Sequence, residues 1–192
     1  MLKNSDYISD GEGHLKKSIG MYHRCYHLSD SQSNIFKVIN QNPGIRYREL
    51  ARQTGFANGV ITYHLNVLEQ IGCINKFNHS NITRYYPINI PSQDPKILSH
   101  LRVPSEKDII LFILDHDFCT FNEIVEYSKK APSTISWHLK RLCQDGLVAV
   151  HSGDFNLYGI AERELVILTF EKYKESFTDK VVNNFVDISD EL

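Results

Sequence analysis

The chain has 192 residues, of which 42% are hydrophobic and 23% are charged, the balance of a soluble globular protein. No segment approaches the run of about 18 apolar residues that a membrane helix needs, and the polar first thirty residues lack the apolar core of a signal peptide. We therefore expect a cytoplasmic protein with no membrane partner. The four cysteines form no CxxC or CxC pair, which argues against a disulfide scaffold and against a zinc site built from cysteine pairs.

The net charge of −2 is unevenly distributed along the chain. Residues 31–90 contain six basic and two acidic residues, a balance of +4, whereas residues 105–160 contain five basic and eight acidic residues, a balance of −3. The last 32 residues carry four basic and eight acidic residues. A basic segment can bind a polyanion locally, whatever the total charge of the chain.

Residues 1–30 form an N-terminal extension whose weak apolar pattern predicts only partial order. Within it, His23, Cys25 and His27 offer three possible metal ligands in five positions. A fourth ligand is not evident, so we expect no metal site in the extension.

The chain then contains an internal repeat. Residues 60–74 align without gaps on residues 134–148, and the same offset places Ile35 on Ile109. One register held over so many apolar positions indicates a duplicated domain of roughly 60 residues, a size that can fold alone.

In each copy, the apolar spacing predicts three helices followed by a β-hairpin. Thr120 and Glu123 form a capping-box pattern, Pro132 suits a first helical turn, and Gly72 and Gly146 suit helix ends. The predicted helices lie near 33–41, 47–54 and 58–70, and near 105–115, 121–129 and 132–144. The predicted strands lie at 73–77 and 83–88, and at 147–151 and 155–160. This order is that of a winged helix-turn-helix domain, so the fold class is mainly α with small β-hairpin wings.

The copies are expected at 31–90 and 105–160, joined by a linker at 91–104 in which residues 96–101 form one or two helical turns. Residues 161–192 are expected to form a long amphipathic helix and an acidic tail. An apolar stripe runs along this helix at intervals of three or four residues, through Val166, Phe170, Tyr173, Phe177, Val181 and Phe185. The stripe either seals the second domain or forms a homodimer interface, and we expect the homodimer.

Three segments carry a resemblance to a known group: Arg48–Leu50, Asn58–Leu65 and Thr83–Pro87. Together with the helix at 132–144, they resemble the winged helices of ArsR- and MarR-type regulators. The tandem arrangement looks like archaeal transcription regulators that carry two such domains. ArsR-type metal sensors have a cysteine pair in their second helices, whereas 47–54 and 121–129 contain none, so metal sensing is not expected.

The third helix of each copy has the properties of a DNA-recognition helix. In the first copy, Ile61, Leu65 and Leu68 are expected to form its inward apolar stripe, which leaves the opposite face outward. A major groove about 12 Å wide admits one α-helix, whose outward side chains reach base edges. Asn66 is suited to adenine, Thr62 to a thymine methyl or a phosphate, and Arg84 and Lys76 on the first wing to phosphate or minor-groove contact. The candidate DNA-binding residues are Asn58, Thr62, Tyr63, Asn66, Lys76, Arg84, Ser133, Ser136, Trp137, Lys140 and Arg141.

Some of these side chains have a purely structural interpretation. Tyr63 and Trp137 can equally pack against neighbouring helices. The resemblance implies that the repeated histidines, His64 and His138, are half-buried packing residues and neither metal ligands nor pH switches. The remaining cysteines in the second copy, Cys119 and Cys143, are interpreted as apolar fillers and not as redox sensors.

The favoured function is sequence-specific binding of double-stranded DNA in transcription control, with the transcription machinery as a further candidate partner. The sequence contains no P-loop, HExxH or GxSxG motif, so we expect neither an enzyme nor a cofactor. The main alternative is a protein-interaction scaffold without intrinsic DNA specificity, for which the acidic second copy and tail leave room. A ligand- or redox-sensing regulator is a third hypothesis, although the sequence defines no pocket.

Overall fold

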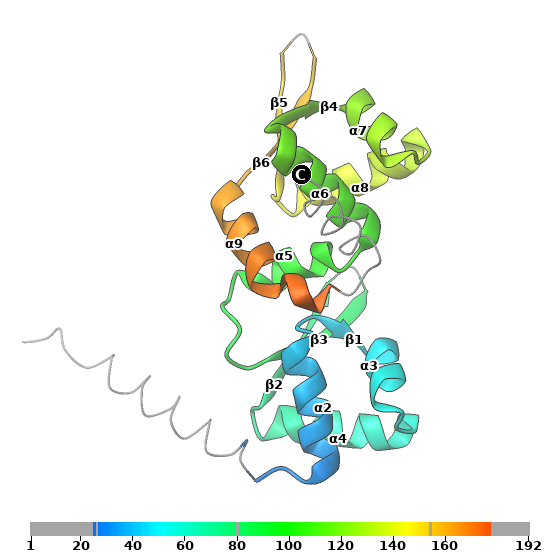
Figure 1. Cartoon of the computed structure of the whole chain (residues 1–192), viewed down its shortest axis with the longest axis vertical. Coiled ribbons are helices and arrows are strands. Elements are labelled where there is room, and N and C mark those ends of the chain that lie inside the picture. The colour runs from blue at the N-terminus through cyan, green and yellow to red at the C-terminus, as the bar shows by residue number, and fades with distance from the viewer. Residues whose placement is uncertain (1–24, 26, 80, 154, 178–192) are drawn as a thin grey trace, which may run out of the picture. The chain divides into compact units, whose positions relative to one another are not determined.

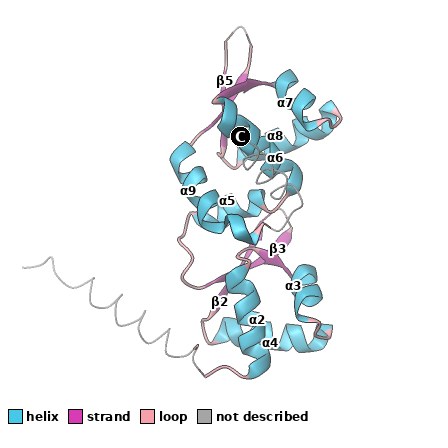
Figure 2. Cartoon of the chain, in the orientation of Figure 1, coloured by secondary structure: helices cyan, strands magenta, loops and turns pink. Residues whose placement is uncertain are grey.

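A computed structural model describes residues 25, 27–79, 81–153 and 155–177 (Figure 1). These residues form two compact units. The first unit comprises the described residues up to Gln41 together with Ile45–Asn89, and the second comprises Asn42–Gly44 and the described residues from Ile90 onward. Both units combine helices with a small antiparallel sheet (Figure 2). The mainly helical fold with β-hairpin wings, predicted from the sequence, is thereby confirmed.

The first unit contains three helices and a three-stranded sheet. Its elements are α2 (Asp30–Gln41), β1 (Ile45–Arg46), α3 (Tyr47–Thr54), α4 (Asn58–Gln70), β2 (Ile74–His79) and β3 (Ile82–Pro87). The strand order is β1-β3-β2, with both pairs antiparallel. The wing hairpin is thus formed by β2 and β3, while β1 adds a short third strand that sequence periodicity did not predict.

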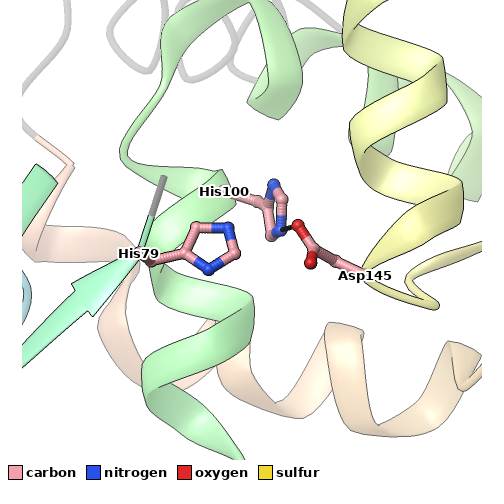
Figure 3. Close-up of side chains that lie close together, drawn as sticks. All are labelled: His79, His100 and Asp145. Carbon is pink, nitrogen blue, oxygen red and sulfur yellow. Dashed lines mark ion pairs between the residues drawn. The ribbon is translucent and has the colours of Figure 1, made fainter. Parts of the chain in front are cut away.

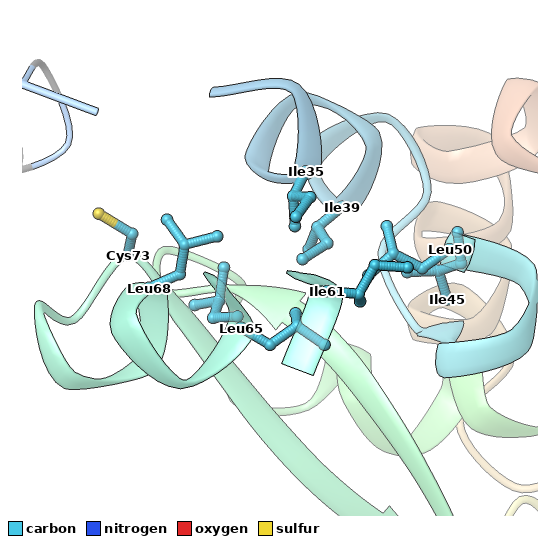
Figure 4. Packing of buried hydrophobic residues seen from close by; sticks show 9 residues of the cluster. Ile35, Ile39, Ile45, Leu50, Ile61, Leu65, Leu68 and Cys73 are labelled. Atoms are coloured by element: carbon cyan, nitrogen blue, oxygen red, sulfur yellow. The ribbon is translucent and has the colours of Figure 1, made fainter. Parts of the chain in front are cut away.

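The core of the first unit lies between α2, α3, α4 and the sheet. Figure 4 shows the side chains of these elements converging on one another. The apolar stripe predicted for α4 points inward, since Ile61, Leu65 and Leu68 are all buried. Burying each such side chain contributes about 1.5–3 kcal/mol to folding, so this face fixes which side of α4 remains outside. The buried cluster consists of Ile35, Ile39, Ile45, Leu50, Ile61, Leu65, Leu68, Cys73 and Ile74.

A disulfide joins Cys25 to Cys73, which are 48 positions apart in the sequence. The expectation that the scattered cysteines form no disulfide was therefore wrong for this pair. Spacing in the sequence does not reveal the pairing, because the fold brings Cys25, upstream of α2, against the turn that follows α4. As a disulfide partner, Cys25 is not a free thiolate ligand for the metal site weighed in the N-terminal extension; His23 lies outside the described residues.

The second unit repeats the same order and adds a helix on either side. Its elements are α5 (Asp94–Leu101), α6 (Pro104–His116), β4 (Phe118–Thr120), α7 (Phe121–Ser128), α8 (Pro132–Gln144), β5 (Val148–His151), β6 (Leu157–Ile160), α9 (Arg163–Tyr173) and the 3₁₀ turn η1 (Lys174–Ser176). The sheet order β4-β6-β5 matches that of the first unit. α5 lies in the segment expected to be a linker, and most of its residues are buried.

Local sequence signals explain where the helices of the repeat begin and end. The Thr120 side chain accepts a hydrogen bond from the Glu123 backbone N–H at 3.3 Å, and the Glu123 carboxylate accepts one from the Thr120 N–H at 2.7 Å. This is the predicted capping box. Pro132 occupies the first turn of α8, and the chain leaves α4 and α8 through Gly72 and Gly146, both with positive φ.

The long C-terminal helix predicted from residue 161 was wrong in extent. α9 ends at Tyr173, and Phe177 folds back so that its ring stacks on Phe170, with centroids 5.8 Å apart. The Arg102 guanidinium lies 4.9 Å from the Phe177 centroid, and the Tyr173 hydroxyl donates to buried Asp94 at 2.7 Å. This part of the apolar stripe therefore seals the second unit, whereas Val181 and Phe185 lie outside the described residues.

Candidate nucleic-acid interface

In the first unit, α3 and α4 form a helix-turn-helix whose second helix is anchored at its start. The turn passes through Gly55 in the left-handed conformation. The Tyr47 hydroxyl, on α3, donates to the carbonyl oxygen of Asn58 at 2.8 Å and lies 3.1 Å from the Thr62 Oγ1. These contacts fix the first turn of α4, the part of a recognition helix that contacts bases in helix-turn-helix proteins.

The structure places the predicted α4 residues on one exposed surface. Asn58, Thr62, Tyr63 and Asn66 are all exposed, and 63% of Tyr63 is accessible. The alternative in which Tyr63 packs against a neighbouring helix is thus not what the structure shows. Its ring instead meets the adjacent His64 edge-on, at 5.1 Å between centroids.

The second unit presents a corresponding surface on α8. Ser133, Ser136, Trp137 and Lys140 are exposed, with Trp137 at 55%, whereas Arg141 is only partly exposed. The Arg141 guanidinium lies 5.0 Å from the Trp137 ring centroid, within cation–π range. An aromatic ring and a guanidinium are both suited to stack on bases or to lie along a phosphate backbone.

The two wing residues predicted to contact DNA are not equivalent in the structure. Arg84 is only 2% exposed; it lies on the central strand β3, opposite Arg46 on β1 and Phe77 on β2. The predicted phosphate contact of Arg84 is therefore contradicted by its burial. Lys76 is exposed on β2 and forms an ion pair with Glu69 at 2.7 Å, a contact that also raises the pKa of the lysine.

Sequence reasoning missed a buried ionic network in the second unit, centred on Glu106 of α6. The Oε2 atom of Glu106 lies 2.8 Å from His100 Nδ1 on α5, and Oε1 lies 3.0 Å from both His138 Nδ1 and Arg141 Nη1 on α8. The other His100 nitrogen, Nε2, lies 3.0 Å from Asp145 Oδ2 at the end of α8 (Figure 3). The network ties three helices together.

The environment of Glu106 favours its ionised form. Burial by itself raises the pKa of the carboxyl, but hydrogen bonds from His100 and His138 and the nearby Arg141 charge outweigh burial, so the pKa is lowered. His138 is thus buried as the packing interpretation implied, and it also carries a polar contact. The sequence signal that could have revealed the buried network is Glu106, an acidic residue in the first turn of a predicted core helix.

The free cysteines of the second unit match the interpretation as apolar fillers. Cys119 is buried, and desolvation together with nearby acids raises the pKa of its thiol to about 11. Burial also raises the pKa of Cys143. Thiol oxidation proceeds through the thiolate, so both shifts disfavour reactivity at neutral pH.

Comparison with known proteins finds two separate family matches along the chain. Residues 29–98 match a family described as an N-terminal HTH domain, and residues 106–150 match the family described as bacterial regulatory protein, arsR family. The chain is also 28% identical over 146 residues to an uncharacterized HTH-type transcriptional regulator of Methanocaldococcus jannaschii.

That alignment covers 76% of this chain and 36% of the archaeal protein, so the chain spans about a third of its relative's length. Among the described residues, no helix is both long and apolar enough to cross a membrane. The family matches fall on the two repeats, each of which contains the helix-turn-helix and wing described above. The chain therefore carries two helix-turn-helix domains in tandem, the first similar to the N-terminal HTH domain family and the second similar to the arsR family of bacterial regulatory proteins.

Proposed function

We propose that this protein is a transcription regulator that binds double-stranded DNA sequence-specifically, with α4 and α8 in the major groove. One observation carries the proposal. At equivalent positions of the two repeats, the helix that follows the turn buries its apolar stripe and leaves a polar, aromatic face open to solvent, with Tyr63 and Trp137 more than half exposed. A helix presented in this way fits the width of the major groove.

The exposed side chains divide into two chemical roles. Asn66 can form the paired hydrogen bonds that identify adenine, and Thr62 can contact a thymine methyl group. Ser133, Ser136 and Lys140 are suited to phosphates and base edges on α8. In the first wing, Lys76 and not Arg84 contacts a phosphate. To do so, the Lys76 ammonium group leaves its ion pair with Glu69. The likeness to an archaeal HTH-type transcriptional regulator supports the regulatory role, with the transcription machinery as a further partner.

Binding-site selection from a random duplex pool, followed by mutagenesis, tests the proposal. Asn66→Ala should relax preference at one base position, costing about 1–3 kcal/mol of discrimination there. Lys76→Ala should weaken binding to all duplexes and lower the salt slope by about 1, whereas Arg84→Ala should leave that slope unchanged. Selection that enriches no sequence over the starting pool would contradict specific recognition.

A second candidate function, a protein-interaction scaffold, is favoured by the second wing. Large apolar side chains are exposed on and beside this hairpin: Phe118, Val150, Phe155 and Leu157, with Phe155 at 76%. Exposed apolar surface of this kind is characteristic of protein contacts and contributes little to phosphate binding. The two functions are compatible, because the apolar side chains and the exposed face of α8 belong to different elements of the second domain.

A further inference from the structure

Glu106 connects the interior of the second domain to its exposed recognition face. The carboxylate is fully buried, and its Oε1 holds the Arg141 guanidinium at 3.0 Å. The same guanidinium covers the Trp137 ring at 5.0 Å. A guanidinium fixed by an ion pair on one side and stacked on a ring on the other restricts the rotamers of both side chains.

We propose that Glu106 is a positioning residue for α8: by holding Arg141, it sets the orientation in which Trp137 is presented. His138, adjacent to Trp137, shares the same carboxylate oxygen at 3.0 Å and meets the Trp137 ring edge-on at 4.8 Å. Two neighbours of the ring are therefore oriented by one buried acid. The inference deepens the proposed function. The orientation of Trp137 does not depend on DNA; only the statement that the ring contacts DNA rests on the proposed function.

The first domain shows that the winged-helix fold does not require this network. At the repeat offset, Gln32 replaces Glu106 and Val67 replaces Arg141. The Gln32 side chain instead caps the start of α2, accepting from the Ser29 N–H at 2.9 Å. Nδ1 of His64, the counterpart of His138, has no hydrogen-bond partner in the part of the chain that the structure describes. The same three helices and hairpin form nonetheless, which assigns the network a role specific to α8.

His100 on α5 contacts the Glu106 carboxylate through Oε2, the oxygen that does not hold Arg141. Its two ring nitrogens face two carboxylates, Glu106 on α6 and Asp145 at the end of α8. α5 therefore buttresses Glu106 against α8. Displacing α5 would change the support of the recognition face without altering any residue that touches DNA.

Trp137 is the only tryptophan of the chain, so its fluorescence reports the orientation directly. We would measure the emission maximum, the steady-state anisotropy and acrylamide quenching of the intact protein without DNA. Glu106→Gln is expected to lower the anisotropy, shift emission to longer wavelength and increase quenching. Glu164→Gln, which removes an exposed carboxylate from α9, is the control and should change none of these.

Arg141→Met tests the same link from the partly exposed side, and remains informative if Glu106→Gln fails to fold by circular dichroism. It should reproduce the change in fluorescence, and the double variant should add nothing further, since both changes break one chain of contacts. Unchanged fluorescence in folded Arg141→Met, or in folded Glu106→Gln, would overturn the proposal.

A DNA-binding experiment on the same variants separates this inference from the proposed function. Glu106→Gln should relax base preference at positions read by α8 and leave intact the position read by Asn66. If the wild-type chain binds no duplex, the proposed function fails while the fluorescence result still decides the positioning role. If DNA binding is normal and fluorescence is unaffected, the positioning role alone fails.

Discussion

Individual residues in this chain are held by partners far away in the sequence. Cys25 is bonded to Cys73, and Glu106 holds His138 and Arg141 across the second domain. Neither set could be predicted from spacing, because the contacts depend on how elements pack and not on periodicity. Residues whose position follows from helical periodicity behaved differently: Ile61, Leu65 and Leu68 were predicted to point inward, and all are buried.

The Cys25–Cys73 disulfide should stabilise the first domain by restricting its unfolded chain. For a closed loop of this length, the expected contribution is roughly 2–4 kcal/mol. Thermal melts with and without dithiothreitol should show a lower melting temperature in the reduced protein. Cys25→Ser should melt at the reduced value under both conditions. A melting temperature that does not change when mass spectrometry shows complete reduction would contradict this expectation.

Glu106 should make the second domain sensitive to acid. Because its pKa is lowered in the folded state, its contribution to stability is complete above the ordinary carboxyl pKa of 4.5 and is lost as the pH falls through the lower folded value. Melting temperatures measured from pH 7 to pH 3 should therefore fall more steeply for the wild type than for Glu106→Gln. At pH 7, the variant should be less stable by about 3–5 kcal/mol, since it removes the carboxylate that pairs with Arg141 inside the domain. Parallel pH profiles would count against the ionised network.

At the scale of elements, the sequence predicted the long helices well and the short strands poorly. α3 and α4 coincide with the predicted ranges 47–54 and 58–70, and α8 with 132–144. For α4 and α8, a buried apolar stripe marks the helix and Gly72 or Gly146 follows its end, while Pro132 occupies the first turn of α8. β1 and β4 were missed, since strands of two or three residues have no period to detect and exist only through pairing with β3 and β6. The end of α9 was missed because the continuing apolar stripe masks where the chain leaves the helix.

The two faces of each recognition helix should respond differently to truncation. Leu65→Ala and Leu139→Ala remove buried side chains and should each cost roughly 2–5 kcal/mol of unfolding free energy. Their exposed neighbours, Asn66→Ala and Lys140→Ala, should stay within about 0.5 kcal/mol of the wild type. Denaturant unfolding of the four variants measures both effects. Equal losses within a neighbouring pair would mean that the helix face is wrongly assigned.

At the scale of the whole molecule, the two domains share a fold but differ in charge and surface. The segment at 31–90 carries a balance of +4, and the segment at 105–160 a balance of −3. The second domain compensates with a cationic group around α8, including Lys140 and Arg141, and with an apolar wing. The tandem arrangement was evident from the repeat, whereas the burial of Arg84 was not, because its sequence context resembles that of an exposed wing residue.

A homodimer through the C-terminal helix remains a prediction for the whole molecule. Part of the apolar stripe packs within the second unit, but Ile167 and Leu168 on α9 are exposed, Leu168 at 68%. Light scattering should therefore give the mass of a dimer for the wild type and that of a monomer for Leu168→Glu. Glu164→Gln is the matched control on the same helix. A monomeric wild type at high micromolar concentration would rule out this interface.

DNA affinity measured as a function of salt tests the central claim most directly. Fluorescence anisotropy of a labelled duplex, titrated with the intact protein at several salt concentrations, gives the slope of log affinity against log salt. Because Lys76, Lys140 and other cations of the two domains neutralise phosphates, we expect a clearly negative slope. Because the recognition helices contact bases, we also expect tighter binding to a selected duplex than to a scrambled one of the same length. Failure to bind either duplex above background at the lowest salt concentration would contradict DNA binding and leave the scaffold function in its place.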